Sequence, residues 1–313
     1  MTALIQLRNL QVAFDGVPAL RGIDLDVQPG EAVGLVGESG CGKSVTWLAA
    51  LGLLPRHARV TGSVRLEDTE LLGAAPATLD KVRGGRVAMI FQDPASSLNP
   101  VIPVGRQIEE ALSRHCGLSG QAARAEARRL FDEVGIPDPA RRLAAYAHEM
   151  SGGQNQRVMI AMALAGRPDL LIADEPTTAL DATIQAQILD LLRRVQREHG
   201  MALVLISHDL GVVADMCDRV GVMYAGRMIE HAPADDIFAA PHHPYTKGLL
   251  AALPDMIGPR RRLLAIPGGV PHPDAMPPGC AFAPRCGLAG PDCDVAVPPL
   301  RTIAANHVSA CLR

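Results

Sequence analysis

The 313-residue sequence is poor in aromatic residues, which make up 3% of it, and has no long hydrophobic run. No window approaches the roughly 18 consecutive apolar residues that a membrane-spanning helix needs. The N-terminal "MTALIQLRNL" lacks the basic start and apolar core of a signal peptide and begins like a strand. We therefore expect a protein that stays in the cytoplasm.

Basic runs are also missing, and the net charge is −3. A nucleic-acid-binding surface normally needs clustered lysine or arginine, so we expect no nucleic-acid partner. The hydrophobic content of 48% is enough for a sizeable core.

Cysteine is scarce until the tail, which is rich in proline and glycine: three occur in the first 279 residues and four in the last 34. Disulfides are rare in a reducing cytoplasm, which leaves a metal centre or free thiols. The tail spacing C-x5-C-x6-C-x17-C lacks the close pairs typical of zinc sites, whereas an iron–sulfur cluster accepts cysteines from wider loops. The four residues are Cys280, Cys286, Cys293 and Cys311.

Strand-like and helix-like segments alternate along most of the chain, which predicts an α/β core with a largely parallel sheet. Residues 101 to 158 are helical in character and are interpreted as an insertion. After about residue 240 proline becomes frequent and periodicity fades, so a small C-terminal module is expected there. One helix is clear, because four apolar residues share a face and a glycine follows the helix: Ile184, Ile188, Leu191, Val195 and Gly200.

"GESGCGKS" lies between an apolar strand and a helix, the context of a phosphate-binding loop. Its glycines allow backbone N–H groups to surround phosphates, Lys43 would reach the β- and γ-phosphates, and Ser44 would bind Mg²⁺. The alternative is a chance glycine-rich turn. The residues expected to bind ATP here are Gly37, Glu38, Ser39, Gly40, Cys41, Gly42, Lys43, Ser44 and Val45.

The apolar strand "LLIADE" ends in Asp174 and Glu175. Asp174 can hold Mg²⁺ and Glu175 can polarise the attacking water. Strands that end in two acids are common, but the phosphate loop earlier in the chain makes this one more specific.

"MSGGQNQR" contains a Ser-Gly-Gly turn that opens a helix, and such a turn is a second potential anion site. One nucleotide cannot easily use two phosphate sites of the same chain, so two chains are expected to share nucleotides. An ordinary helix N-cap explains the serine but not the paired glycines. The residues are Ser151, Gly152, Gly153 and Gln154.

With these motifs the chain resembles the nucleotide-binding subunits of ATP-binding-cassette transporters over about residues 3 to 240. The resemblance implies a P-loop cassette domain at 1–240, with its helical subdomain at about 101–158, and an irregular cysteine-rich extension at 241–313. Met150 stands where the family's signature usually has leucine, and Asn155 where glutamine or arginine is common. Neither change removes a phosphate-contacting group.

The resemblance also assigns roles to single residues. Gln92 in "MIFQDP" is similar to the glutamine that senses Mg²⁺ and the membrane partner, and Asp181 to an aspartate at the dimer seam. His208 in "LISHDL" resembles the switch histidine at the γ-phosphate, although a histidine at the end of a strand is often structural. Phe14 stands where an aromatic ring stacks on adenine, and a core role is its alternative.

Four segments are together similar to peptide-importer ATPases: "MIFQDPASSLNP" (89 to 100), "PHHPYTKGLLAALP" (241 to 254), "IPGGVP" and the tail "GCAFAPRC". That group implies two permease subunits, a second cassette that is usually a paralogue, an extracytoplasmic substrate-binding protein and a peripheral place on the cytoplasmic face of the membrane. It includes importers of nickel, glutathione and other small solutes, which stay alternatives to peptide. Its cysteine-rich tail is associated with a [4Fe–4S] cluster; zinc and free thiols stay open.

The expected reaction is ATP hydrolysis with Glu175 as general base and with Lys43, His208 and Mg²⁺ stabilising charge. A soluble cassette acting on nucleic acid or ribosomes is the rival from another class. Such proteins usually have coiled-coil insertions, a second cassette or basic arms, none of which is found in this sequence. A catalytically weak partner subunit is a third reading, which intact Glu175 and His208 disfavour.

Overall fold

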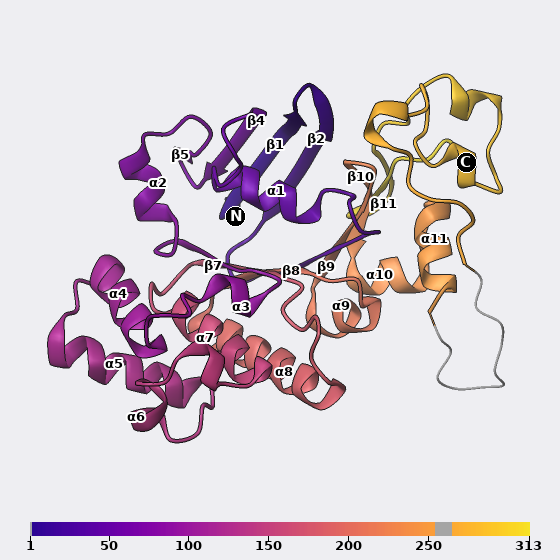
Figure 1. The fold of residues 1–313 in the computed structure, drawn as a ribbon. Coiled ribbons are helices and arrows are strands. Elements are labelled where there is room, and N and C mark those ends of the chain that lie inside the picture. Colours follow the sequence, from indigo (N-terminus) through magenta and orange to yellow (C-terminus); the bar gives the residue numbers. More distant parts are fainter. Residues whose placement is uncertain (1, 254–264) are drawn as a thin grey trace. The chain divides into compact units, whose positions relative to one another are not determined.

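The computed structural model describes residues 2–253 and 265–313, which form two compact units (Figure 1). The first contains residues up to 27, residues 32–73 and residues from 207 onward. The second contains residues 28–31 and 74–206. The boundary expected near residue 240, between the cassette domain and the C-terminal extension, is a division along the sequence and is not a boundary between these two units. It stays a prediction.

An antiparallel sheet in the first unit has the strand order β2-β1-β4-β5. A tight turn joins its first two strands, because Asp15 and Gly16 both adopt positive φ, as a two-residue hairpin turn requires. The sequence predicted strands here but not that they form a separate antiparallel sheet. The elements are β1 (Ile5–Phe14), β2 (Val17–Val27), β4 (Ala58–Leu66) and β5 (Thr69–Glu70), with helix α1 (Lys43–Ala50) following β3.

The other strands of the first unit pair in the order β11-β12-β10-β9-β3. β3 and β9 are parallel, and β10 pairs with β9 and β12 in antiparallel fashion. The cysteine-rich tail thus contributes two strands, where the sequence predicted no regular structure. The elements are β3 (Ala32–Val36), α9 (Leu210–Met216), β9 (Arg219–Tyr224), β10 (Arg227–Pro233), α10 (Ala234–Ala239), α11 (Pro244–Ala251), β11 (Arg301–Ala304) and β12 (His307–Ser309).

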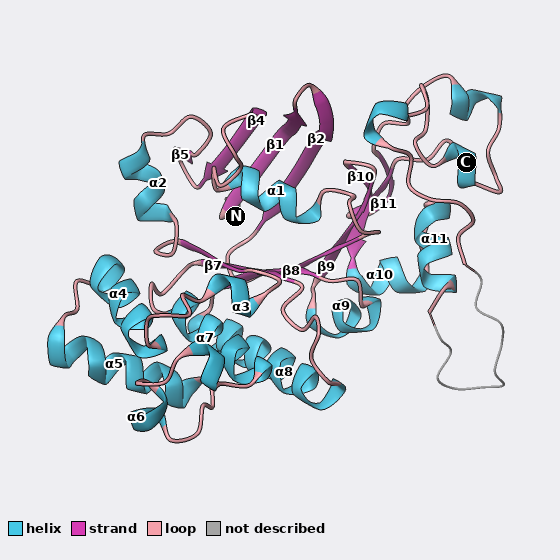
Figure 2. Cartoon of the chain, in the orientation of Figure 1, coloured by secondary structure: helices cyan, strands magenta, loops and turns pink. Residues whose placement is uncertain are grey.

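The second unit contains three parallel strands in the order β6-β7-β8 and most of the helices (Figure 2). Every residue of β7 and β8 is buried, as continuous apolar strands of a parallel sheet require. The elements are α2 (Pro76–Val82), β6 (Val87–Ile90), α3 (Pro94–Ser97), α4 (Val104–Cys116), α5 (Gly120–Glu133), α6 (Pro139–Arg142), α7 (Gly152–Leu164), β7 (Leu170–Asp174), α8 (Ala182–His199) and β8 (Ala202–Ile206).

Helix α8 confirms the periodicity expected of it. Ile188, Leu191 and Val195 are buried on one face, and the helix ends at Gly200, whose φ of 63° is the left-handed conformation of a helix C-cap.

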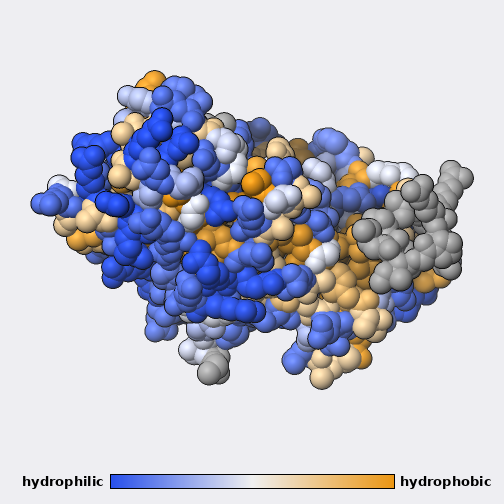
Figure 3. All heavy atoms as spheres, turned by 90° about the horizontal axis from the view of Figure 1, so that it is seen from below, coloured by the Kyte–Doolittle hydropathy of each residue, from blue (hydrophilic) through white to orange (hydrophobic). Residues whose placement is uncertain are grey.

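None of the helices in the described part of the chain has the length and apolar character to cross a bilayer. On the face drawn in Figure 3, hydrophilic and hydrophobic surface are interspersed. Among the big apolar side chains that the structure describes, Val101 at 77% and Val295 at 78% have the largest exposed fractions.

A buried carboxylate, Glu230 of β10, connects the tail to the rest of the first unit. Its oxygens accept hydrogen bonds from the backbone N–H groups of His242 (2.6 Å) and His243 (2.9 Å), just before α11. The ring nitrogen Nε2 of His307 on β12 lies 2.7 Å from the same carboxylate. A fully buried charge is tolerated only when it is paired and hydrogen-bonded in this way.

Replacing Glu230 by alanine removes the shared acceptor from the buried His243 N–H, the partly buried His242 N–H and the His307 ring. We expect Glu230→Ala to lower the free energy of unfolding by about 3–5 kcal/mol and to make the tail sensitive to protease. Urea unfolding and limited proteolysis measure these effects. Glu198→Ala is the control, because Glu198 is 54% exposed and changes of this kind stay within about 0.5 kcal/mol. Equal stability of the two variants would contradict the role of Glu230.

Candidate nucleotide-binding site

The loop Gly37–Ser44 joins β3 to α1 in the first unit. Gly37 has a φ of 151°, and a Cβ atom there would lie 2.3 Å from the carbonyl oxygen of Met223. Gly42 has a φ of 104°, and a Cβ there would lie 2.4 Å from Leu20. Both positions therefore require glycine, which confirms the strand–loop–helix context expected of a phosphate-binding loop.

Lys43 is buried at the start of α1, and its ammonium group points back into the loop. Its Nζ donates hydrogen bonds to the carbonyl oxygens of Gly37 (2.8 Å) and Glu38 (3.2 Å). The positive charge and the N-terminus of α1 thus lie at one loop, an arrangement suited to anions. Burial raises the pKa of the neighbouring Cys41 thiol, and the charge of Lys43 opposes this effect.

Two further predicted residues belong to the first unit. Phe14 is half-buried at the end of β1, and its ring centroid lies 6.1 Å from that of His57. His208 is exposed and precedes Asp209, whose carboxylate accepts the Gly211 and Val212 N–H groups and caps α9. The adenine-stacking and switch roles of Phe14 and His208 stay predictions.

Glu175 follows β7 in the second unit and meets Gln92 there. The amide nitrogen Nε2 of Gln92 donates to Glu175 Oε2 at 3.0 Å, and the Thr178 hydroxyl donates to the same oxygen at 2.9 Å. Glu175 has a φ of 47°, a left-handed conformation that is uncommon for this residue type and concentrates at functional sites. The structure thus brings the predicted base and the predicted sensor together, next to buried Asp174.

The Ser-Gly-Gly turn opens α7 as an N-cap. The Ser151 hydroxyl accepts the Gln154 N–H (3.3 Å), and the Gln154 side chain accepts the Ser151 N–H (3.1 Å), which forms a capping box. Gly153 also has a structural reason, because a Cβ there would lie 2.6 Å from Ile184 of α8. Asp181 caps α8 differently, because its carboxylate accepts the N–H groups of Thr183 and Ile184. These helix-capping roles do not test phosphate binding by Ser151–Gln154 or the dimer contact of Asp181.

Two contacts to the phosphate loop were not predicted, and both come from the C-terminal part of the chain. The Tyr245 hydroxyl accepts the backbone N–H of Glu38 at 2.9 Å. The guanidinium of Arg285 forms two 3.0 Å hydrogen bonds with the two carboxylate oxygens of Glu38. The pKa of Arg285 is lowered by burial but raised more strongly by its bonds to Glu38 and Tyr224, so the net shift is upward. The one local signal for this contact in the sequence is that the loop motif carries an acid, Glu38, as its second residue.

The four tail cysteines are free thiols, and no group of three or more possible ligands in the described residues is placed to hold a metal. Cys280 and Cys293 are joined by a 2.7 Å backbone hydrogen bond. Backbone N–H groups donate to the sulfurs of Cys286 and Cys311, each at 3.4 Å. Such donors suit thiolate ligands, so the donor chemistry fits a cluster although the closed four-sulfur geometry is not formed.

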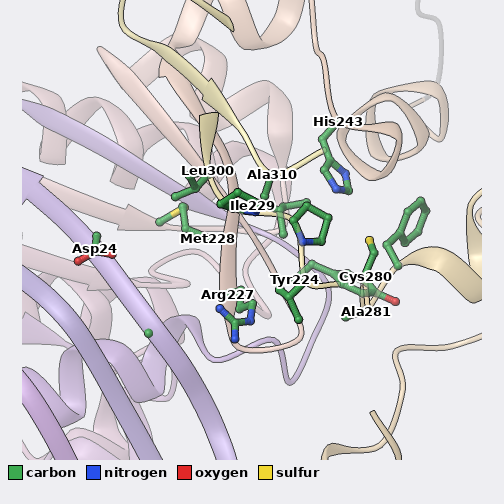
Figure 4. Close-up of a pocket in the computed structure, with 15 residues that line it drawn as sticks. Asp24, Tyr224, Arg227, Met228, Ile229, His243, Cys280, Ala281, Leu300 and Ala310 are labelled. Carbon is green, nitrogen blue, oxygen red and sulfur yellow. The ribbon is translucent and has the colours of Figure 1, made fainter. Parts of the chain in front are cut away.

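Beside these cysteines is a cavity of about 190 Å³ (Figure 4). Tyr224, His243 and Phe282 form part of its wall, and of the four tail cysteines only Cys280 lines it. The cavity is therefore no cage for a four-cysteine centre.

Comparisons with known proteins agree with both halves of the sequence interpretation. The family model described as "ABC transporter" matches residues 20–178. The model described as "Oligopeptide/dipeptide transporter, C-terminal region" matches residues 229–293.

Three related proteins cover most of the chain. A Brucella abortus (strain 2308) relative, whose name describes a peptide import ATP-binding protein, is 51% identical over 98% of this chain and 94% of its own. The oligopeptide transport ATP-binding protein OppD of Haemophilus influenzae is 47% identical over 99% and 97%. A dimeric ATP-binding cassette in a post-hydrolysis state with ADP and Pi has a TM-score of 0.65 and 27% identity, and covers 74% of this chain and 98% of its own.

His243 makes the attachment of α11 sensitive to acid. It is buried and its Nδ1 accepts the Tyr245 N–H at 3.1 Å, and burial lowers its pKa to about 4, an effect to which His242 adds and which Glu230 opposes. Between pH 6.5 and 4 the unfolded chain therefore binds a proton at this histidine that the folded chain does not. As the pH is lowered through this range, the free energy of unfolding falls by about 1.4 kcal/mol per pH unit.

We expect His243→Asn, which keeps an N-cap acceptor but cannot titrate, to reduce this loss of stability. Urea unfolding at pH 7.5, 6, 5 and 4.5 measures it. The matched control is His272→Asn, because His272 also accepts an N–H two residues ahead (3.4 Å) but its side chain is 74% exposed. Parallel stability profiles for wild type and His243→Asn would refute the prediction.

Proposed function

The chain belongs to the ABC transporter family, and from this we propose that it is the ATP-hydrolysing subunit of an importer for di- or oligopeptides. The observation that carries the proposal is the presence, on one chain, of both the cassette match at 20–178 and the peptide-transporter C-terminal match at 229–293. Nickel, glutathione or another small solute is the alternative cargo. In the proposed importer, the substrate-binding protein and the permease subunits select the cargo, and this chain does not. A soluble cassette acting on nucleic acid is disfavoured by the second match.

The proposed catalytic chemistry uses the residues to which the family resemblance assigns roles at the ATP site. Lys43 and the loop N–H groups would hold the β- and γ-phosphates, and Ser44, Gln92 and Asp174 would hold Mg²⁺, which when bound would supply positive charge to the phosphates. Glu175 acts as general base on the attacking water. The hydrogen bond between Gln92 and Glu175 supports this assignment, because it couples the metal-sensing side chain to the base. His208 stabilises the γ-phosphate as charge develops.

We further propose that two cassettes bind two ATP molecules head to tail. Each nucleotide then lies between the loop Gly37–Ser44 of one chain and the turn Ser151–Gln154 of the other, with Asp181 at the seam and Phe14 against adenine. The solved dimeric cassette with ADP and Pi supports this arrangement by similarity. A paralogous second cassette is the expected partner.

The proposed place of the protein is the cytoplasmic face of the membrane, against two permease subunits that receive cargo from an extracytoplasmic binding protein. The segment after Gln92 is the proposed permease contact. Two apolar side chains near it support this, because Phe91 is 40% and Val101 77% exposed. The side chains of residues 95 and 96 in the same segment lie outside the described part.

Glu175→Gln tests the enzymatic proposal. We expect it to keep ATP binding but to lower hydrolysis roughly 10²–10⁴-fold, because the amide cannot accept the proton of the attacking water. Nucleotide binding and phosphate release by the transporter complex measure the two effects, with Glu198→Gln on α8 as control.

In cells, a deletion strain complemented with wild type or Glu175→Gln is tested for uptake of labelled dipeptide and of nickel. Peptide uptake restored by wild type alone supports the proposal. Restoration of nickel uptake only would redirect the cargo, and normal turnover by Glu175→Gln would remove Glu175 as the base.

The tail cysteines form a separate proposal: Cys280, Cys286, Cys293 and Cys311 ligate a [4Fe–4S] cluster with a structural role. Four thiolates and the N–H donors to Cys286 and Cys311 support it. Zinc in the same site is the alternative.

Anaerobic purification tests the cluster. We expect a brown protein with about four iron and four sulfide per chain, and loss of both in Cys293→Ser. Cys116→Ser is the control, because Cys116 lies in α4 of the other unit. A colourless protein, with or without zinc, would contradict the cluster.

A further inference from the structure

The second residue of the phosphate loop, Glu38, is held at both its backbone and its side chain by residues from the C-terminal part of the chain. The Tyr245 hydroxyl accepts its N–H, and the Arg285 guanidinium pairs with its carboxylate through two parallel hydrogen bonds. Both partners lie in residues 229–293, which match the model of the oligopeptide/dipeptide transporter C-terminal region. The contact is therefore an addition to the cassette rather than part of it.

This contact is largely sheltered from water. Tyr245 is fully buried, and the side chains of Arg285 and Glu38 are 6% and 26% exposed. Two-point charge-assisted bonds of this kind are stronger and more directional than single ones, and burial protects them from screening by salt.

Arg285 is itself fixed from several sides. Its Nε donates to the Pro267 carbonyl (2.8 Å) and a terminal nitrogen to the Tyr224 hydroxyl (3.2 Å). Its guanidinium carbon lies 5.8 Å from the ring centroid of Tyr224 and 5.9 Å from that of Phe282. The guanidinium thus has one orientation, and that orientation sets the position of the Glu38 side chain.

Held in this way, the backbone of Glu38 sets the positions of the N–H groups and of the lysine that would contact phosphate. Its N–H is already used by Tyr245, so the N–H groups that can surround a phosphate begin after Glu38. Its carbonyl and that of Gly37 are the acceptors of the Lys43 ammonium. A change in the backbone at Glu38 would therefore move both the lysine and the start of the phosphate cradle.

We propose that Arg285 and Tyr245 are positioning residues of the ATP site, through which the C-terminal extension sets the conformation of the phosphate-binding loop. The proposal deepens the ATP-hydrolysing function proposed above and rests on it. Neither residue touches nucleotide; each acts through Glu38.

The test measures Mg-ATP affinity by calorimetry with the full chain, and KM and kcat with the transporter complex. We expect Arg285→Ala to weaken ATP binding and raise KM about tenfold, with a smaller effect on kcat. Arg285→Lys is expected to restore part of the affinity, because it keeps the charge but not the fork. Arg8→Ala is the matched control, since Arg8 makes a two-point pair with Asp26 between β1 and β2; it leaves affinity unchanged.

Two milder variants keep the test decisive if Arg285→Ala does not fold. Glu38→Gln weakens the pair and Tyr245→Phe removes one hydroxyl, and each is expected to weaken binding severalfold. Arg285→Ala added to Glu38→Gln is expected to lower the affinity for Mg-ATP little more than either change alone.

Variants that lose thermal stability but bind Mg-ATP like wild type would overturn the positioning role while the ATPase function stands. A wild-type chain that does not bind Mg-ATP would instead overturn the function on which it rests.

Discussion

The buried carboxylate of Glu230 is the interaction on which the C-terminal half of the first unit depends. It accepts N–H groups at the entry to α11 and lies against His307 of β12, so one side chain joins a cassette strand to two separate parts of the tail. The same part of the chain brings Tyr245 and Arg285 to the phosphate loop. These polar contacts add to a small buried aromatic cluster, in which the rings of Tyr224, Tyr245 and Phe282 pack against one another.

Backbone conformation is the second constraint, and it applies both in the phosphate loop and at Glu175. Gly37 and Gly42 adopt conformations and close approaches that a side chain would block, whereas Glu175 accepts a left-handed φ despite its side chain. This backbone conformation costs free energy at Glu175, but it holds the Glu175 carboxylate against Gln92 and Thr178. The position of the carboxylate thus outweighs the cost in stability.

The sequence was sufficient where local pattern decides structure. The α8 helix follows from the spacing of Ile188, Leu191 and Val195, and the phosphate loop from its glycines. It was insufficient where residues distant in the chain meet. Nothing local indicates that β12 pairs with β10, or that Arg285 pairs with Glu38 across nearly 250 positions. The cysteine spacing likewise suggested a ligand set, but not how the four sulfurs are arranged.

The pairing of β12 with β10 has a consequence for the integrity of the cassette itself. Glu230 and His231 face Ser309 and Val308 across this ladder, so the tail satisfies backbone groups along the outer edge of β10. Beyond it, β11 is only four residues long and exposed throughout. A chain shortened near residue 240 would retain every nucleotide-binding motif. It would also leave the edge of β10, a strand of mostly buried residues, without its neighbouring strand. Unpaired edges of this kind pair with other chains and cause aggregation. The extension therefore also serves as a cover for a strand edge.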